Sequence, residues 1–179
     1  LVAVNKGGLL INIDSQAPNQ IAWEAFQSGK LQIPGYEYPL EVRREVKFGG
    51  SRLDFCLEGS FGMAYGEVKG VTLEENGICS FPDAPTERGV RHIEELIAAK
   101  KAGYGAFLLF IVQMEGMKFL IPNEKTHPAF GEALREAAKA GVAIIARTCS
   151  VEPGSIWLDG EIPVYPDGIP GKTSGNLPG

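Results

Sequence analysis

The chain has 179 residues, of which 44% are hydrophobic and 22% are charged, a composition that is ordinary for a globular protein with one sizeable core. No apolar run approaches the roughly 20 residues that a membrane-spanning helix needs, so we expect no membrane partner. The formal net charge of -5 argues against a protein that coats nucleic acid by bulk charge. Any phosphate-binding role would then require a local cluster of cations or a metal ion.

The three cysteines are an odd number and lack the spacing of metal ligands. Cys56, Cys79 and Cys149 each lie in or beside a predicted strand, where a reduced cysteine serves as a small core residue. Reduced cysteines of this kind fit a cytoplasmic protein.

Glycine turns and apolar runs divide the first part of the chain into short elements. The start predicts a β-hairpin that turns at Gly7-Gly8, and a start inside a hairpin suggests that the natural protein is longer at this end. A short helix is predicted over 18–28 and ends at Gly29. Three strands follow, over 40–48, 51–58 and 64–73, as an antiparallel meander.

The second part of the chain alternates strands with helices. Helical apolar periodicity over 86–102 and 128–140 separates continuous apolar runs that have the length of buried strands. With the strand at 64–73, the strands at 104–113 and 142–148 complete two consecutive β-α-β crossovers, which place their strands parallel. The sequence therefore predicts an α/β fold with a mixed β-sheet flanked by helices.

Two neighbouring predicted strands contain charges where apolar side chains are expected, in SRLDFCLEGSFGMAYGEVKG, residues 51–70. Leu53, Phe55 and Leu57 are predicted to fill one face of the first strand, with Asp54 between them. Glu67 and Lys69 flank Val68 and therefore share a face of the second strand. If the two strands pair as a hairpin, Asp54 projects near Glu67.

Two carboxylates about 4 Å apart repel each other by about 4 kcal/mol at an effective dielectric constant of 20, and a divalent cation converts this repulsion into affinity. Oxygen ligands suit Mg²⁺ or Mn²⁺, which can activate a water molecule and polarise a phosphodiester. Lys69 would orient the attacking water and stabilise the added negative charge. The alternative is a surface ion pair at a strand end, because the same EVK triplet also occurs at residues 45–47.

Three motifs in order, SRLDFCLEG, YGEVKGVTL and FPDAPTERGVRHIEEL, resemble the sugar fermentation stimulation protein A (SfsA) family. The resemblance runs from about residue 9 to about residue 164. It implies a nuclease-like α/β domain of the PD-(D/E)xK, restriction-endonuclease-like fold over 15–164. It also implies that residues 1–14 are the end of a truncated N-terminal OB-type barrel, and the Pro/Gly-rich residues 165–179 are expected to be a flexible tail.

The resemblance assigns Asp54 to the acidic position of the PD-(D/E)xK motif and Glu67 and Lys69 to its ExK positions. It implies a DNA-binding protein with a divalent-metal site, which either hydrolyses phosphodiesters or keeps that architecture for binding. The alternative is a non-catalytic DNA-binding regulator of sugar catabolism. A third possibility is an interaction module without a nucleic-acid role, which the acidic net charge favours.

Further candidates surround this site. Glu24, on the first helix, is a candidate third metal ligand or an ordinary exposed helical residue. The candidate nucleic-acid contacts form two groups, one on the strands at 40–48 and 51–58 and one at the start of the helix at 86–102. The structural alternative for the first group is a solvated strand face, and for the second it is helix capping with a Glu87–Arg91 pair. DNA is expected to bind through Arg43, Arg44, Lys47 and Arg52 and through Thr86, Arg88 and Arg91, with the missing N-terminal barrel as a further candidate surface. His92 and His127 show no metal-ligand spacing. A homodimer is a candidate assembly, because one site per chain cuts one strand of a duplex.

Overall fold

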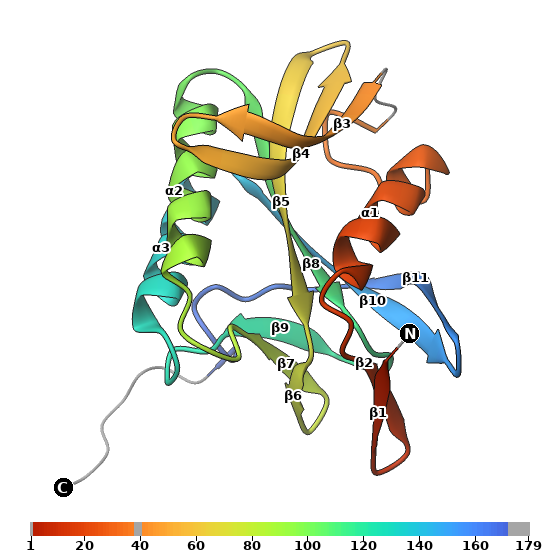
Figure 1. Cartoon of the computed structure of the whole chain (residues 1–179). Helices are drawn as coiled ribbons and strands as arrows, with labels where there is room; N and C mark the ends of the chain where they lie inside the picture. The colour runs from red at the N-terminus through yellow and green to blue at the C-terminus, as the bar shows by residue number, and fades with distance from the viewer. Residues whose placement is uncertain (1, 38–40, 172–179) are drawn as a thin grey trace, which may run out of the picture.

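The computed structural model describes residues 2–37 and 41–171, which form three β-sheets and three helices (Figure 1). The helices are α1 (Ala17–Gln27), α2 (Glu87–Lys101) and α3 (Pro128–Ala140). The strands are β1 (Ala3–Lys6), β2 (Leu9–Asn12), β3 (Glu41–Phe48), β4 (Ser51–Gly59), β5 (Gly62–Val71), β6 (Leu73–Glu75), β7 (Ile78–Phe81), β8 (Gly105–Val112), β9 (Phe119–Pro122), β10 (Ala143–Glu152) and β11 (Ser155–Ile162).

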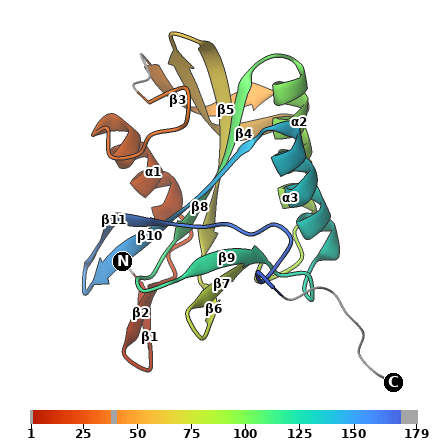
Figure 2. The same ribbon diagram turned by 180° about the vertical axis from the view of Figure 1, so that it is seen from behind.

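The main sheet has six strands in the order β11-β10-β8-β5-β4-β3. The predicted antiparallel meander is β3-β4-β5, and both predicted crossovers are confirmed, because β5 pairs with β8 and β8 pairs with β10 in parallel. Helix α1 lies on one face of this sheet, and α2 and α3 lie on the other (Figures 1 and 2). The mixed α/β architecture expected from the sequence is therefore present.

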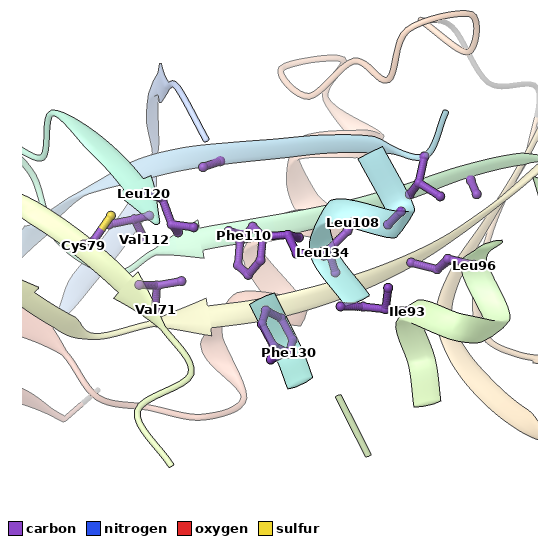
Figure 3. Packing of buried hydrophobic residues seen from close by; sticks show 14 of the residues in the cluster. Val71, Cys79, Ile93, Leu96, Leu108, Phe110, Val112, Leu120, Phe130 and Leu134 are labelled. Atoms are coloured by element: carbon purple, nitrogen blue, oxygen red, sulfur yellow. The ribbon is translucent and has the colours of Figure 1, made fainter. Parts of the chain in front are cut away.

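The core has two parts, one on each face of the sheet. On the α2/α3 side, Ile93 and Phe130 of the helices belong to one buried cluster with Phe110 of β8 and Val71 of β5 (Figure 3). On the α1 side, alternate residues of the same strands pack against the apolar stripe of α1, which consists of Ile21, Ala22, Ala25 and Phe26. Strand β8 contributes to both parts, which explains its continuous apolar run.

Two glycines of β5 let α1 approach the sheet closely. A Cβ at Gly66 would lie 1.9 Å from the ring of Phe107, and a Cβ at Gly70 would lie 2.7 Å from Pro18 of α1. Helix α1 ends where the sequence predicted, because Gly29 has a φ of 71°, which an L side chain rarely adopts. These glycines place the first turn of α1 directly over β5.

A second, three-stranded sheet has the order β6-β7-β9, and no pattern in the sequence predicted it. Strands β6 and β7 were missed because each is short, although Asn76-Gly77 is a typical hairpin turn and both residues have positive φ. The third strand of this sheet, β9, pairs in parallel with β7.

The ends of the described chain pack against these sheets. The predicted hairpin at Gly7-Gly8 is confirmed as β1-β2, and its last residue Asn12 donates a backbone hydrogen bond to Gln113; its assignment to an OB-type barrel stays a prediction. Tyr165, the first residue of the expected tail, donates its N–H to the carbonyl of Leu120 in β9. Residues 172–179 of that tail lie outside the described residues. Within 2–37 and 41–171, no helix combines the length and the hydropathy that crossing a membrane requires.

Candidate functional site

The candidate site lies where β4 separates from β5. The two strands pair from Gly59↔Gly62 to Phe55↔Gly66, and the ladder ends there, so that Asp54 and Glu67 are the next residues in register. Beyond this point β5 continues alone along β8, away from β4 (Figure 1). The predicted approach of Asp54 to Glu67 is therefore present, but in a gap of the sheet and not within a regular ladder.

The faces of β4 differ from the prediction for this strand. Phe55 and Leu57 belong to the α1 side of the core, whereas Leu53 belongs to the α2/α3 side, so the three residues do not share a face. The side-chain alternation breaks at Asp54 because Glu45, opposite it on β3, has a φ of 51° and the ladder skips this pair. Asp54 thus lies at a distortion of two strands, which frees its side chain from the regular alternation.

Asp54 is fixed by β5 and by α1. Its Oδ2 accepts a hydrogen bond from the backbone N–H of Val68 at 2.8 Å, and its Oδ1 accepts one from Nδ2 of Asn19 at 3.1 Å. Burial raises the pKa of Asp54 to about 6, with a further contribution from the nearby charge of Glu67, against the opposing effects of Val68 N–H, Lys69 and Asn19. The carboxyl is therefore held in place but is expensive to ionise.

Glu67 lies on the α2 side of β5 and is 2% exposed. Its Oε1 accepts a hydrogen bond from Lys69 Nζ at 2.6 Å and contacts Nδ1 of His92 on α2, and its Oε2 accepts one from the backbone N–H of Asp54 at 3.3 Å. Burial works against the charge of Glu67, but His92 and Lys69 together outweigh it and lower the pKa of this carboxyl below its ordinary value. Glu67 therefore stays ionised although it is almost fully buried.

The structure brings Asp54, Glu67 and Lys69 together, as the strand spacing predicted. Glu24 is placed elsewhere: it accepts a hydrogen bond from Gln20 at 2.7 Å and lines a hollow of about 500 Å³ between α1 and the start of β11. Among the described residues, Asn19 is the α1 side chain that contacts Asp54.

Two residues of this site, Asn19 and His92, were not predicted as members of it. His92 is 4% exposed and continues the buried stripe of α2 between Gly89 and Leu96. The helical periodicity of α2 is the sequence signal that could have assigned it to the inner face. Asn19 follows Pro18 at the start of α1, a position that by itself indicates only the first turn of a helix.

Two of the four basic residues of the cluster on β3 and β4 lie near acidic side chains. Arg43 lies 3.8 Å from the carboxylate of Glu58, and Arg52 lies 3.9 Å from that of Glu45. Arg44 is on the α1 side, with its guanidinium 5.5 Å from the ring centre of Trp23, and Lys47 is exposed on β3. These geometries agree with a solvated strand face and leave nucleic-acid contacts by the four residues as a prediction.

The start of α2 is capped within the chain. Oγ1 of Thr86 accepts the N–H of Gly89 at 2.9 Å, and the N–H of Thr86 is donated to Nδ1 of His127 at 2.9 Å. The capping role weighed for Thr86 is therefore present. Arg88 and Arg91 are exposed on this first part of α2, where they remain candidate phosphate contacts.

The donor set suits a hard cation bound by few protein atoms. Within the described ranges, no three or more His, Cys, Asp or Glu side chains are grouped as metal ligands. The charge of Glu67 is nevertheless close enough to raise the pKa of Asp54, and Oδ1 of Asn19, whose Nδ2 contacts the Asp54 carboxylate, is buried without a hydrogen-bond partner. An ion such as Mg²⁺ typically uses one or two carboxylates and keeps several waters, so the residues present fit it.

Comparisons with known proteins agree with this architecture. Residues 16–155 match the family described as "Sugar fermentation stimulation protein RE domain". A sugar fermentation stimulation protein homolog of Clostridium botulinum (strain Loch Maree / Type A3) is 50% identical over 165 residues, which cover 92% of this chain and 71% of the relative. A homolog from Desulfitobacterium hafniense (strain Y51) is 48% identical over 156 residues, covering 87% of this chain and 66% of the relative.

A solved structure shares the fold. The structure of Pyrococcus furiosus SfsA in complex with Ca²⁺ superposes with a TM-score of 0.84 at 32% sequence identity, and the match covers 92% of this chain and 71% of that one. The family match spans most of the chain and includes both strands of the candidate site. The chain therefore belongs to the sugar fermentation stimulation protein (SfsA) family.

Proposed function

We propose that this protein is a DNA-binding member of the SfsA family with a PD-(D/E)xK-type metal site, formed by Asp54, Glu67 and Lys69, for phosphodiester hydrolysis. The observation that supports this most is the meeting of Asp54 and Glu67 at the point where β4 leaves β5, with the Lys69 ammonium on Glu67. An acidic pair and a lysine at a break in a sheet cost stability without a ligand, which favours a functional reason for them.

The proposed cofactor is Mg²⁺ or Mn²⁺, held by Asp54 and Glu67. Such an ion, when bound, lowers the pKa of a water molecule and neutralises charge that develops on a phosphodiester. Oε2 of Glu67 has one long hydrogen bond, at 3.3 Å, and is the less occupied oxygen of that carboxylate. The Ca²⁺ in the Pyrococcus furiosus relative is also a hard ion that takes oxygen ligands.

Lys69 has the role of a charge-stabilising and water-orienting group in this proposal. Its side chain is 16% exposed, so Nζ is close to the surface while it pairs with Glu67. A substrate phosphate that reaches the site would meet this ammonium next to the two carboxylates, where it favours the additional negative charge of the transition state. Glu24, because it lines the separate hollow along α1, is not required for this arrangement.

The nucleic-acid surface is proposed to include the exposed cations closest to the site. Arg44 pairs in register with Phe55, the neighbour of Asp54, and Arg88 lies on the first turn of α2, next to His92. The protein acts in the cytoplasm in this proposal, in agreement with three free and buried cysteines. Two chains acting as a pair would cut both strands of a duplex.

A metal titration combined with a cleavage assay tests the proposal. Mn²⁺ binding is measured by calorimetry for the wild type and for the Asp54→Asn/Glu67→Gln double variant, and each protein is incubated with single- and double-stranded DNA. We expect binding and cleavage by the wild type and neither by the variant. Cleavage that survives in a folded double variant would refute the assignment.

The alternative is a non-catalytic DNA-binding regulator of sugar catabolism. One observation favours it: Lys69 and His92 already satisfy Oε1 of Glu67, so this carboxylate has internal partners without a cation. In that case DNA binding is expected to fall steeply with salt while Mn²⁺ binding and cleavage are absent.

A further inference from the structure

We propose that His92 is a positioning residue for the candidate site: it fixes one oxygen of Glu67 so that the other oxygen is available to a divalent cation beside Asp54. This inference rests on the proposed metal site. It assigns a role to a residue of α2 that lies outside the Asp54, Glu67 and Lys69 set, and it gives the ring of that residue a definite tautomer.

The contacts of Glu67 distinguish its two oxygens. Oε1 has two partners, Lys69 Nζ at 2.6 Å and His92 Nδ1, whereas Oε2 has one, the N–H of Asp54 at 3.3 Å. Both ring and carboxylate are almost fully buried, at 4% and 2% exposure, so neither exchanges this contact for water. The lysine and the histidine together prevent the carboxylate from rotating and leave Oε2 toward Asp54.

The second ring nitrogen of His92 determines where the ring hydrogen is. Arg88, one turn earlier on α2, donates its Nε–H to Nε2 of His92 at 3.4 Å. A nitrogen that accepts a hydrogen bond has no hydrogen of its own, so the hydrogen of a neutral ring is on Nδ1, where it is donated to Glu67. Metal-site histidines and carboxylates are commonly oriented by such outer partners.

His127 provides a natural contrast and a matched control. It is also buried, at 7% exposure, and it also contacts the start of α2, but its Nδ1 accepts the N–H of Thr86 at 2.9 Å. Its ring hydrogen is therefore on Nε2, which lies 3.6 Å from the carboxylate of Glu87. The only two histidines of the chain are thus expected in opposite tautomers.

The first measurement uses the unmodified protein. Two-dimensional ¹⁵N–¹H NMR of the imidazole rings at neutral pH distinguishes the two tautomers, and the His127→Leu variant assigns the two sets of signals. We expect an Nδ1–H ring for His92 and an Nε2–H ring for His127. A His92 ring that has its hydrogen on Nε2 overturns the inference, whatever the variants do.

The second measurement is Mn²⁺ affinity, by calorimetry, for wild type, His92→Leu, His92→Asn and His127→Leu. The loss of the ring in His92→Leu is expected to weaken binding by about 10- to 100-fold, as is common when the outer partner of a metal ligand is removed. Asparagine places an N–H near the position of Nδ1–H, so His92→Asn is expected to recover most of the affinity. His127→Leu is expected to lower the melting temperature while it leaves Mn²⁺ affinity within about 2-fold of wild type.

The outcomes separate the two proposals. Wild-type protein that does not bind Mn²⁺ refutes the metal site and this inference together. Wild-type binding that His92→Leu and His127→Leu weaken equally, or that His92→Asn fails to restore, refutes only the role of His92. If His92→Leu does not fold, His92→Asn alone decides, because its Mn²⁺ affinity must stay close to wild type.

Discussion

The two carboxylates of the site are held in opposite ways by the two faces of the protein. On the α2 side, Glu67 is surrounded by donors from Lys69 and His92, and its pKa is lowered in spite of burial. On the α1 side, Asp54 has a neutral amide and a backbone N–H, and its pKa is raised to about 6. The sheet gap therefore pairs a carboxylate that stays ionised with one that resists ionisation.

This difference gives each half a separate function in the proposed site. Glu67, which forms the α2 half of the site, is ionised near neutral pH. Asp54, which forms the α1 half, has a charge that a bound cation would stabilise further. The affinity for a metal ion bound between them would then depend on pH mainly through the ionisation of Asp54. Four substitutions sharpen this comparison, beginning with the largest expected effect.

Lys69→Met removes the cation of the α2 half. It leaves Glu67 buried with His92 as its remaining side-chain partner, and breaking a buried ion pair in this way costs about 3–5 kcal/mol. Without the ammonium the pKa of Glu67 rises, so the loss is expected to increase as the pH rises above the ordinary range of a glutamate. Urea unfolding measures it, with Lys47→Met on exposed β3 as the control, and a loss below about 1 kcal/mol contradicts the comparison.

Gly66→Ala tests the packing that places α1 over the site. The new methyl group would lie 1.9 Å from the ring of Phe107, so the ring must move, and we expect a loss of about 1–3 kcal/mol in thermal unfolding. Phe107→Leu in the same chain should recover part of this loss, since the two side chains share one space. If Gly66→Ala unfolds like the wild type, the close approach of α1 is not needed for stability.

Asp54→Asn removes the carboxyl that resists ionisation in the α1 half. The pKa of Asp54 is raised in the folded protein from 3.8 to about 6, so the folded state binds the proton more tightly and stability falls as the pH rises through this interval. At about pH 8 the variant should be more stable than the wild type by about 1–3 kcal/mol, and at about pH 4 the gain should disappear. Urea unfolding at both pH values checks this, and a gain that is equal at both would attribute it to packing.

Asn19→Ala has the smallest expected effect. It removes the hydrogen bond from Nδ2 to Asp54, but it also removes the unpaired Oδ1, so the net loss is about 1 kcal/mol. The pKa of Asp54 should rise further, because a donor to its charged form is lost. NMR titration of the Asp54 carboxyl measures this shift, and Gln20→Ala, at the exposed neighbour on α1, is the control that should not change it.

Local patterns in the sequence predicted most of the fold. The apolar runs of β8 and β10 and the helical stripes of α2 and α3 predicted both crossovers, because strands buried on two faces and helices buried on one have different periods. Strands β6 and β7 are too short for such a period and become stable only by pairing with each other and with β9. Their positions depend on tertiary contacts that local patterns do not contain.

For the site, the sequence predicted what one strand or one hairpin determines. Glu67 and Lys69 share a face because they are two residues apart on β5, and Asp54 is near because the hairpin register places it there. Asn19 is 35 positions from Asp54, and His92 is 25 positions from Glu67, so their contacts depend on how the helices pack. The change of face at Leu53 depends in turn on the unusual φ of Glu45, which no composition or period indicates.

The hydrogen bond from the backbone of Val68 to Asp54 has a spectroscopic consequence. Elsewhere in β5 the N–H groups that face β4 are hydrogen-bonded to the backbone of β4. The N–H of Val68 is instead hydrogen-bonded to the Asp54 carboxyl, which can gain a proton or, in the proposed site, a cation. The amide chemical shift of Val68 should therefore change whenever the charge on Asp54 is neutralised, while the chemical shifts of the amides paired with β8 stay constant. The protein thus contains a reporter of its own site in the main chain, which follows the state of the carboxyl without any added label.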